Sequence, residues 1–264
     1  MATSLPVILT IAGSDSGGGA GIQADLKTFA ALGVHGTSAI TCLTAQNPKG
    51  VSAIQVAKPA IVRAQIEAVF AELRPAAVKT GMLFDTAIIR EVAEFFGKLP
   101  GQKPPLIVDP VMVATSGARL LKPAALRAMQ KNLLPLAALV TPNLDEAEIL
   151  VGRRLKSVDD LRAAARAIHQ RFLCAALVKG GHLRGLREAV DIFFDGKTEL
   201  LLSAPFVRGV STHGTGCTYS AAIAAYCALG YDLPRAVQLA KKFITRAIAG
   251  SVRTGKHFVL NPFA

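Results

Sequence analysis

The chain of 264 residues has no tryptophan, three tyrosines and four cysteines. Its 30 Lys and Arg residues give a net charge of +12, but they form no dense basic run. With so few aromatic side chains for base stacking, this composition argues against nucleic-acid binding. A basic surface that attracts anionic small molecules is the favoured interpretation. The cysteine spacing fits neither a zinc site nor a disulfide framework and suits a reducing cytosol; the residues are Cys42, Cys174, Cys217 and Cys227.

Long hydrophobic runs are also missing. No segment approaches the roughly 20 apolar residues that a membrane-spanning helix needs. The first residues do not show the basic segment and apolar core of a secretory signal, so we expect a cytoplasmic protein. Hydrophobic residues still make up 51 % of the chain, which predicts a folded protein. The length fits a single large α/β domain over residues 1–264.

Short apolar runs alternate with amphipathic segments along the chain. We predict strands at 6–12, 34–44, 51–56, 76–80, 106–112, 136–140 and 175–178, and a hairpin at 190–194 and 199–202. We predict helices at about 22–33, 59–75, 85–96, 123–133, 157–172, 218–230 and 232–250, with another opening near 143. This alternation predicts an α/β fold with a mostly parallel central sheet and helices on both faces. Ligands of such folds bind outside the carboxyl ends of the strands.

A glycine-rich loop in the last third of the chain leads directly into an alanine-rich helix. It reads Ser211-Thr212-His213-Gly214-Thr215-Gly216-Cys217, and the helix is predicted to end at Gly230. Free backbone N–H groups at such a helix start, together with the helix dipole, form an anion-binding site. Cys217 stands where the loop becomes helix, a position that lowers the pKa of a thiol. A tight turn followed by a small buried cysteine is the plainer interpretation.

A second glycine-rich loop, from Gly13 to Gly21, follows the first predicted strand. Its spacing is not that of the dinucleotide-binding fingerprint, and no Gly-Lys-Ser/Thr sequence closes it as in a Walker loop. Asp25 falls in the next helix, where it either balances the helix dipole or reaches the loop. Gln46 ends the second long strand and is either a turn residue or an amide that reads the polar edge of a heterocycle.

Polar side chains follow three of the later strands. They are Asp109, Asn143 with Glu146, and Lys179. Each alone also fits a structural role, as a turn residue, a helix cap with a first-turn acid, or a solvated strand end. Together they supply what phosphoryl transfer needs, namely carboxylates for Mg²⁺, a lysine for phosphate and a main-chain anion hole.

The motifs lie along nearly the whole chain in a fixed order. They are residues 11–25, Thr44-Ala45-Gln46-Asn47, Asp109-Pro110-Val111-Met112, Thr141-Pro142-Asn143-Leu144-Asp145-Glu146-Ala147-Glu148, Val178-Lys179-Gly180-Gly181-His182 and His213-Gly214-Thr215-Gly216-Cys217. This order resembles the ribokinase-like superfamily, and most closely the hydroxymethylpyrimidine/phosphomethylpyrimidine kinases of thiamin synthesis. In most of the superfamily an aspartate, the catalytic base, ends the last glycine loop. These kinases have a cysteine there, as this chain does at Cys217.

The resemblance implies a role for each matching residue. Gln46 would read the amino and ring-nitrogen edge of a pyrimidine, in a pocket lined also by Gly13, Asp25 and Met82. Glu146 and Asn143 would organise Mg²⁺ and its waters. ATP would contact Lys179, with Asp109 and Asn143 close to it. The anion hole would consist of Gly214, Thr215 and Gly216, with Cys217 as the catalytic base.

The implied activity is an ATP- and Mg²⁺-dependent kinase. It would phosphorylate the hydroxymethyl group of 4-amino-5-hydroxymethyl-2-methylpyrimidine and then the resulting monophosphate. A pyridoxal or pyridoxine kinase of the same fold is one alternative, and a non-catalytic nucleotide- or DNA-binding regulator is another. The chain departs from the family at Ala114-Thr115-Ser116-Gly117, where the family has Ala-Lys-Ser-Gly. Thr115 thus replaces a lysine that could contact phosphate, and this replacement puts in question the phosphate contact that would serve the second phosphorylation.

The pyrimidine and ATP are the expected binding partners, with neither nucleic acid nor a membrane among them. We also expect a homodimer, because the short half-polar strand predicted at 51–56 is an edge that could pair with a second subunit.

Overall fold

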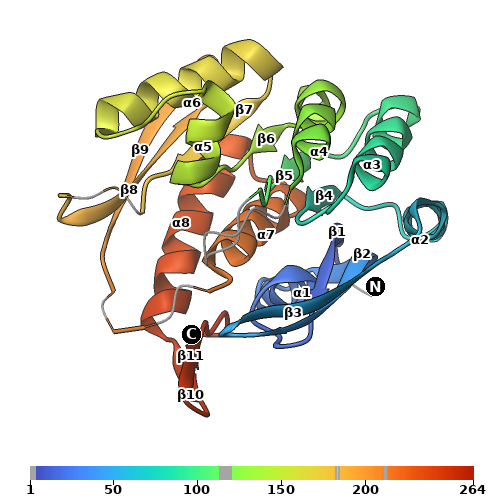
Figure 1. Cartoon of the computed structure of the whole chain (residues 1–264), viewed down its shortest axis with the longest axis horizontal. Coiled ribbons are helices and arrows are strands. Elements are labelled where there is room, and N and C mark those ends of the chain that lie inside the picture. The colour runs from blue at the N-terminus through green and yellow to red at the C-terminus, as the bar shows by residue number, and fades with distance from the viewer. Residues whose placement is uncertain (1–3, 113–120, 182, 184, 208, 211–212) are drawn as a thin grey trace.

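A nine-stranded sheet forms the centre of the protein (Figure 1). The computed structural model describes residues 4–112, 121–181, 183, 185–207, 209–210 and 213–264. The strands are β1 (Val7–Asp15), β2 (His35–Asn47), β3 (Gly50–Val56), β4 (Ala77–Thr80), β5 (Leu106–Val108), β6 (Leu139–Val140), β7 (Ala175–Lys179), β8 (Glu188–Phe194) and β9 (Glu199–Pro205). Their spatial order is β3-β2-β1-β4-β5-β6-β7-β8-β9.

The middle of the sheet is parallel and its two edges are antiparallel. The strands β2, β1, β4, β5, β6 and β7 pair in parallel, each with its neighbour. Antiparallel pairs add β3 at one edge and β8 with β9 at the other. The carboxyl ends of the six parallel strands therefore face the same way, which confirms the predicted α/β class with a mostly parallel sheet.

Helices cover both faces of this sheet, as predicted. One layer contains α1 (Gly21–Ala31), α7 (Thr215–Ala228) and α8 (Leu233–Ala249). The other contains α2 (Pro59–Glu72), α3 (Thr86–Lys98), α4 (Pro123–Ala128), α5 (Leu144–Val151) and α6 (Val158–Phe172). Figure 1 shows the two layers on opposite sides of the strands. None of the described helices is long and apolar enough to cross a membrane.

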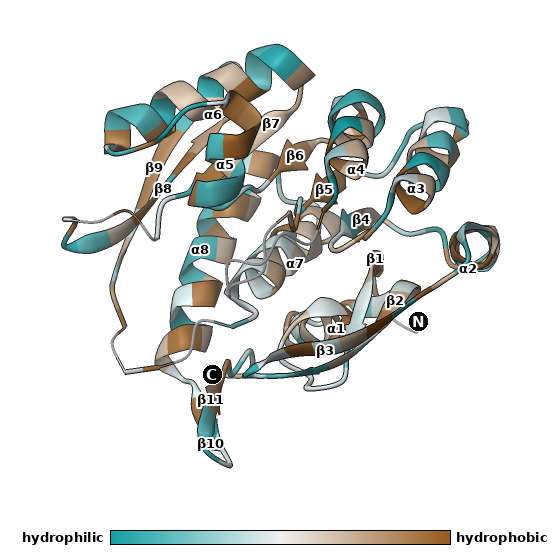
Figure 2. Ribbon diagram, in the orientation of Figure 1, coloured by the Kyte–Doolittle hydropathy of each residue, from teal (hydrophilic) through white to brown (hydrophobic). Residues whose placement is uncertain are grey.

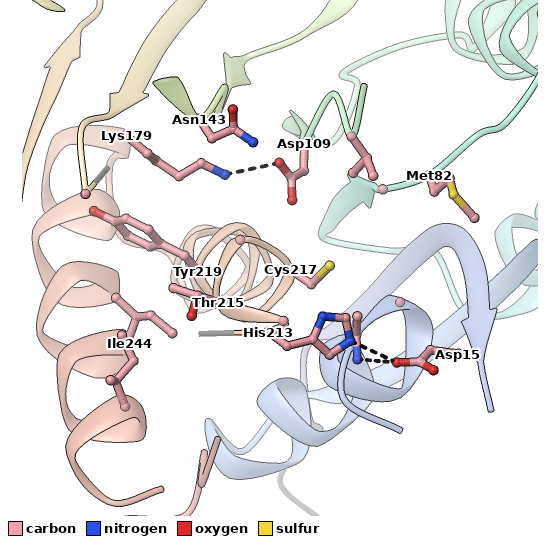
Figure 3. Close-up of a pocket in the computed structure, with 18 of the residues that line it drawn as sticks. Asp15, Met82, Asp109, Asn143, Lys179, His213, Thr215, Cys217, Tyr219 and Ile244 are labelled. Atoms are coloured by element: carbon pink, nitrogen blue, oxygen red, sulfur yellow. Dashed lines mark hydrogen bonds and ion pairs between the residues drawn. The ribbon is translucent and has the colours of Figure 1, made fainter. Parts of the chain in front are cut away.

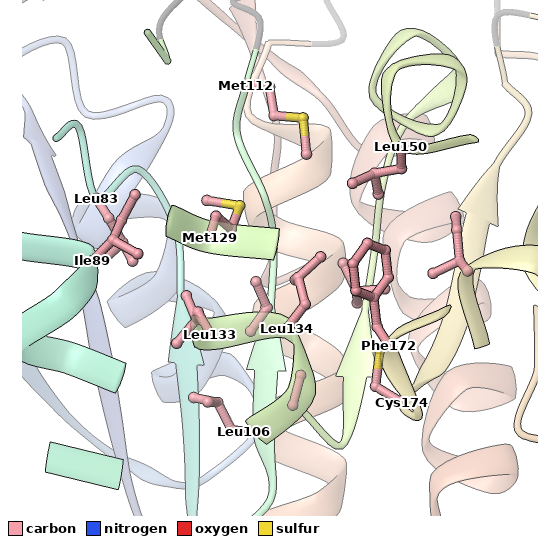
Figure 4. Packing of buried hydrophobic residues seen from close by; sticks show 14 of the residues in the cluster. Leu83, Ile89, Leu106, Met112, Met129, Leu133, Leu134, Leu150, Phe172 and Cys174 are labelled. Atoms are coloured by element: carbon pink, nitrogen blue, oxygen red, sulfur yellow. The ribbon is translucent and has the colours of Figure 1, made fainter. Parts of the chain in front are cut away.

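The packing of the two layers follows from the sequence pattern of their helices. On α3 the apolar residues Ile88, Ile89, Val92 and Phe96 recur at helical spacing and are buried, and Figure 2 shows polar residues on the outer side of the helix. Figure 4 shows how such side chains fill the space between this layer and the sheet. Burial of each large apolar side chain contributes about 1.5–3 kcal/mol.

Helix α7 has no polar side along most of its length. Every residue from Thr218 to Ala225 is buried. Its alanines let α7 lie between α1, α8 and the sheet, because small side chains permit close approach. The first turn of α7 is thereby fixed at the carboxyl edge of the parallel strands.

The predicted boundaries are wrong in the middle of the chain. Strand β5 ends at Val108, not near Met112, so Asp109 is the first residue of a loop. The helix expected at 123–133 is α-helical only to Ala128 and continues as a π-turn and a 3₁₀-turn to Leu136. The 3₁₀-turn contains Pro135, which has no N–H for a helical hydrogen bond. Only Leu139–Val140 then remain for β6.

Two other differences concern the ends of elements. Strand β2 continues to Asn47, so Gln46 belongs to a strand that pairs with β3 rather than to a turn. A C-terminal hairpin of β10 (Val252–Thr254) and β11 (His257–Val259) was not predicted. Its strands are too short to show a clear alternating pattern.

Gly180 occupies a position that has no room for a side chain. A Cβ atom there would collide with the Val190 carbonyl oxygen, which accepts the Gly180 N–H at 3.0 Å, and with Leu161. We expect Gly180→Ala to lower the free energy of unfolding by about 1–3 kcal/mol, because the backbone at Val190 must move. Denaturant unfolding measures this change.

Gly97→Ala is the matched control. Gly97 lies in α3, and a Cβ there would meet nothing within 4 Å. This variant should be equally stable or gain up to about 1 kcal/mol, since alanine favours a helix over glycine. Equal stability of the two variants would contradict the close contact between Gly180 and the Val190 carbonyl oxygen.

Candidate active site

A cavity of about 470 Å³ opens at the carboxyl ends of the parallel strands. Loops after β1, β4, β5, β6 and β7 line it, together with the start of α7 and one side of α8. The predicted site residues that line it are Gly13, Gln46, Met82, Asp109, Asn143, Glu146, Lys179, Gly214, Thr215, Gly216 and Cys217. The structure therefore brings together all but one of the residues that the sequence singled out.

Gly214 shapes the entry into α7. It has φ +82, and a Cβ atom there would collide with the Gly19 carbonyl oxygen. Only glycine fits this position, because other residues rarely adopt that φ. The N–H groups of Thr215, Gly216 and Cys217 lie in the first helical turn, where no intrahelical acceptor exists. This geometry suits an anion whose oxygens accept those N–H groups.

Thr215 supplies a second indication that the first turn of α7 meets a ligand. Its Oγ1 atom is buried and has no hydrogen-bond partner among the residues that the structure describes. A buried hydroxyl without a partner costs free energy, so an acceptor delivered by a ligand would satisfy it. Thr215 lines the cavity (Figure 3).

Lys179 and Asp109 form an ion pair over the same helix start. The Lys179 Nζ donates to Asp109 Oδ1 at 3.3 Å, and Ser220 Oγ donates to Asp109 Oδ2 at 3.2 Å. Burial opposes the positive charge of Lys179, but Asp109 and Glu146 outweigh it and raise the pKa of the lysine. A Cβ on Gly216 would lie 3.2 Å from Lys179 Nζ, which places the ammonium group against the anion hole.

Asn143 and Glu146 form a complete capping box at the start of α5. Asn143 Oδ1 accepts the Glu146 N–H at 3.0 Å, and Glu146 Oε2 accepts the Asn143 N–H at 2.9 Å. Glu146 Oε1 also accepts the Met112 N–H at 2.9 Å. Burial raises the pKa of Glu146 to about 7, with Lys179 opposing the rise and Asp109 adding to it.

The carboxylates of Asp109 and Glu146 suit a hydrated divalent cation. No cluster of three or more His, Cys, Asp or Glu side chains in the described ranges is arranged to hold a metal ion by itself. Mg²⁺ needs no such cluster, since it keeps several waters and uses one or two carboxylates with substrate phosphates. A cation there would also relieve the repulsion between the two acids.

The two ends of the cavity differ in character (Figure 3). Tyr219 and Ile244 lie at the end next to Lys179. The apolar residues Ile248, Phe206 and Val207 also line the cavity. Met82 and Asp15 lie at the opposite end, and Cys217 and Asp109 lie between the ends. The cavity therefore has room for two ligands that meet at the first turn of α7.

We call the Met82 end of the cavity the heterocycle end, after the ring that Gln46 is predicted to read, and Gly13 and Gln46 also lie there. A Cβ on Gly13 would lie 2.8 Å from Cys42 Sγ and 3.0 Å from Met82 Cε, so this glycine lets two sulfur side chains pack beneath the cavity. Gln46 Oε1 accepts from Thr44 Oγ1 at 3.1 Å. An apolar floor with one oriented amide is typical of a site for a small polar ring.

Asp25 is the predicted site residue that does not line the cavity. It is fully buried and accepts from Lys79 Nζ at 2.9 and 2.8 Å and from Thr10 Oγ1 at 2.6 Å. Burial opposes the charge on Lys79, but the Asp25 carboxylate outweighs it and raises the pKa of the lysine. Lys79 itself lines the cavity, so Asp25 holds a cation there from below.

The expected low pKa of Cys217 is wrong. Burial raises the pKa of its thiol to about 11, although Lys79 opposes the rise. The helix start favours a thiolate, but the protein atoms around the partly exposed Cys217 side chain outweigh this effect.

Sequence reasoning gave no role to Lys79 or His213. A lysine within the apolar strand Ala77–Thr80, all of whose residues are buried, is itself a signal, because a buried ammonium group needs a carboxylate partner. His213 stood in a recognised motif, but its partners come from distant strands. Thr115 and His182 lie outside the described residues.

Comparison with known proteins identifies the family. The model of the phosphomethylpyrimidine kinase family matches residues 15–261. A hydroxymethylpyrimidine/phosphomethylpyrimidine kinase from Rhizobium meliloti is 50 % identical over 251 residues, which cover 94 % of this chain and 92 % of the relative.

Solved structures share the fold. A phosphomethylpyrimidine kinase from Clostridium difficile 630 has a TM-score of 0.82 and 46 % identity, covering 92 % of this chain and 99 % of its own. The pyridoxal kinase from Staphylococcus aureus in complex with AMP-PCP and pyridoxal has a TM-score of 0.89 and 35 % identity, covering 99 % and 95 %. These likenesses confirm the ribokinase-like fold. The chain belongs to the phosphomethylpyrimidine kinase family.

Proposed function

We propose that this protein transfers the γ-phosphoryl group of ATP to the hydroxymethyl group of 4-amino-5-hydroxymethyl-2-methylpyrimidine, and then phosphorylates the monophosphate. One observation carries the proposal. The anion hole of α7 lies between a heterocycle end with Gln46 and an apolar end next to Lys179. Bringing two reactants together at a fixed anion site is how such enzymes achieve phosphoryl transfer.

The roles of individual residues follow from this arrangement. The N–H groups of Thr215 to Cys217 would hold the oxygens of the transferring group, where charge develops. Lys179 would balance phosphate charge on the nucleotide side. Glu146 and Asn143 would organise Mg²⁺ and its waters, with Asp109 as a second carboxylate close by, and bound Mg²⁺ would neutralise phosphate charge. The Gln46 amide would read the amino and ring-nitrogen edge of the pyrimidine.

A pyridoxal kinase is the rival function, because solved pyridoxal kinases have a very similar fold. The higher identity to phosphomethylpyrimidine kinases supports the pyrimidine as substrate. A DNA-binding regulator has less support, since the cavity keeps both the anion hole and the paired charges that catalysis needs.

Side-by-side assays distinguish these functions. We expect ATP-dependent phosphorylation of the pyrimidine with kcat/KM at least tenfold above that for pyridoxal, and loss of turnover when EDTA removes Mg²⁺. Faster turnover of pyridoxal would assign the chain to the rival kinase. No ATP consumption with either heterocycle would favour the regulator.

Cellular location and assembly remain proposals as well. The four cysteines are free in the described structure, which supports a reducing compartment such as the cytoplasm.

For the homodimer, β3 is an edge strand with six of its seven residues exposed, from Gly50 to Gln55. An edge of this kind is able to pair with a second chain, and light scattering that gives the mass of one chain would exclude the dimer.

Cys217 is proposed as the base that accepts the proton of the hydroxymethyl group. We expect Cys217→Ala to lower kcat on the order of a hundredfold, the low end of general-base effects, with little change in the KM for ATP. Because the thiol pKa is raised to about 11, the thiolate fraction rises with pH throughout the neutral range. The kcat of the native enzyme should therefore rise with pH, and the alanine variant should lose this dependence.

Two further variants make the Cys217 test specific. Cys217→Asp should retain part of the activity, because most of the ribokinase-like superfamily has an aspartate at this position. Cys227→Ala removes another thiol from α7 that does not line the cavity, and it should leave kcat unchanged. Near-normal turnover by a folded Cys217→Ala protein would refute the base role while leaving the kinase assignment intact.

A further inference from the structure

The two glycine loops of the site touch each other through their backbones. A Cβ on Gly214 would collide with the Gly19 carbonyl oxygen, and a Cβ on Gly19 would lie 2.9 Å from His213 Cδ2. The loop after β1 and the anion-hole loop of α7 are therefore in direct contact. The imidazole of His213 lies at this contact, next to the heterocycle end of the cavity.

One nitrogen of His213 faces two polar groups from different strands. Its Nε2 lies 3.3 Å from Gln46 Nε2, on β2, and 3.5 Å from Asp15 Oδ2, on β1 (Figure 3). The carboxylate of Asp15 also accepts the N–H groups of Gly17 and Ala20, each at 2.8 Å. Burial opposes ionisation of Asp15, but hydrogen bonds from His213 and the backbone outweigh it and lower the pKa of this carboxyl group.

The Gln46 amide is fixed on both of its sides. Its Oε1 lies 3.1 Å from Thr44 Oγ1, which has a shorter contact with the Ser14 carbonyl oxygen at 2.9 Å, and its Nε2 lies 3.3 Å from His213 Nε2. One ring nitrogen of His213 donates to Asp15 or accepts from Gln46, but not both at once, so the proton on His213 decides which end of the amide faces it. The backbone N–H of Gln46 donates to Ser16 Oγ at 2.8 Å, which anchors the residue to the loop after β1. A terminal amide torsion is broad and roughly two-fold, so an amide without such partners can turn its donor and acceptor around.

We propose that His213 is a positioning residue that holds the Gln46 amide in its reading orientation and ties that amide to the anion-hole loop. The inference rests on the proposed function, which gives Gln46 the task of reading the heterocycle. The effect of His213 passes through Gln46, so it should be large for the heterocycle and small for ATP. A residue that only fills space would weaken both ligands together.

A double-mutant cycle of Gln46→Ala and His213→Ala tests the proposal. We expect His213→Ala to raise the KM for the pyrimidine about three- to tenfold, the worth of one hydrogen bond. The KM for ATP should stay within about twofold, since the lost contact does not reach the nucleotide end. Adding His213→Ala to Gln46→Ala should cause little further loss, because contacting residues that act as a unit are not additive.

Two isosteric variants separate the hydrogen bond from simple packing. The amide of His213→Gln reaches the place of Nε2 and offers both a donor and an acceptor, so this variant should restore most of the pyrimidine KM. His213→Asn is one carbon shorter and cannot reach, so it should behave like His213→Ala. His35→Ala, an exposed histidine at the start of β2, is the control and should change nothing. Thermal unfolding of each variant checks the fold.

Several outcomes would overturn the proposal. They are an unchanged pyrimidine KM in His213→Ala, equal losses for pyrimidine and ATP, additive effects in the cycle, or no rescue by His213→Gln. If the native enzyme does not turn over the pyrimidine, the proposed function fails on its own. The same cycle is then measured with pyridoxal, and the same criteria decide the role of His213.

Discussion

The close backbone contact between two glycine loops is the constraint on which the site depends. The loop after β1 reaches the start of α7 because neither Gly19 nor Gly214 has a side chain in the way. A buried, alanine-rich α7 holds its own end of the contact against the sheet. This backbone contact places the anion hole, the candidate base Cys217 and the heterocycle end within one cavity. Their relative positions therefore depend on the main chain rather than on mobile side chains.

Buried charges are arranged around this contact in pairs. Asp109 and Lys179 both line the cavity, whereas Asp25 lies beneath it and pairs with Lys79, which lines it. Breaking such a buried pair leaves an uncompensated charge and is strongly destabilising. Among the described residues Glu146 has no lysine or arginine bound to its carboxyl group, and burial raises its pKa to about 7. A cation beside it would favour the charged form, which supports the proposed Mg²⁺ site.

Much of this arrangement could be predicted from the sequence because it depends on local rules. Asp109 and Asn143 follow strands and Lys179 ends one, and the carboxyl ends of parallel strands meet at one edge. What could not be predicted depends on packing between distant segments. The partner of Lys79 is 54 residues away in the chain, and His213 is 167 residues from Gln46.

Cys217 shows how a correct local rule gives a wrong value. A helix start does favour a thiolate, yet desolvation of the Cys217 thiol by the surrounding protein outweighs it and raises the pKa to about 11. The strand boundaries failed for a related reason. The run from Leu106 to Met112 is apolar except for Asp109, but only three of its residues, Leu106–Val108, find strand partners in the folded sheet. Apolar sequence identifies buried residues more reliably than it identifies their hydrogen bonds.

The central claim is that the anion hole of α7 lies between two bound reactants. A crystal structure with the pyrimidine and a non-hydrolysable ATP analogue tests it most directly. The account predicts a hydroxymethyl oxygen about 3–3.5 Å from the γ-phosphorus, with the phosphoryl oxygens accepting N–H groups of Thr215 to Cys217. A γ-phosphate bound away from this turn, or a pyrimidine bound outside the Gln46 end of the cavity, would contradict it.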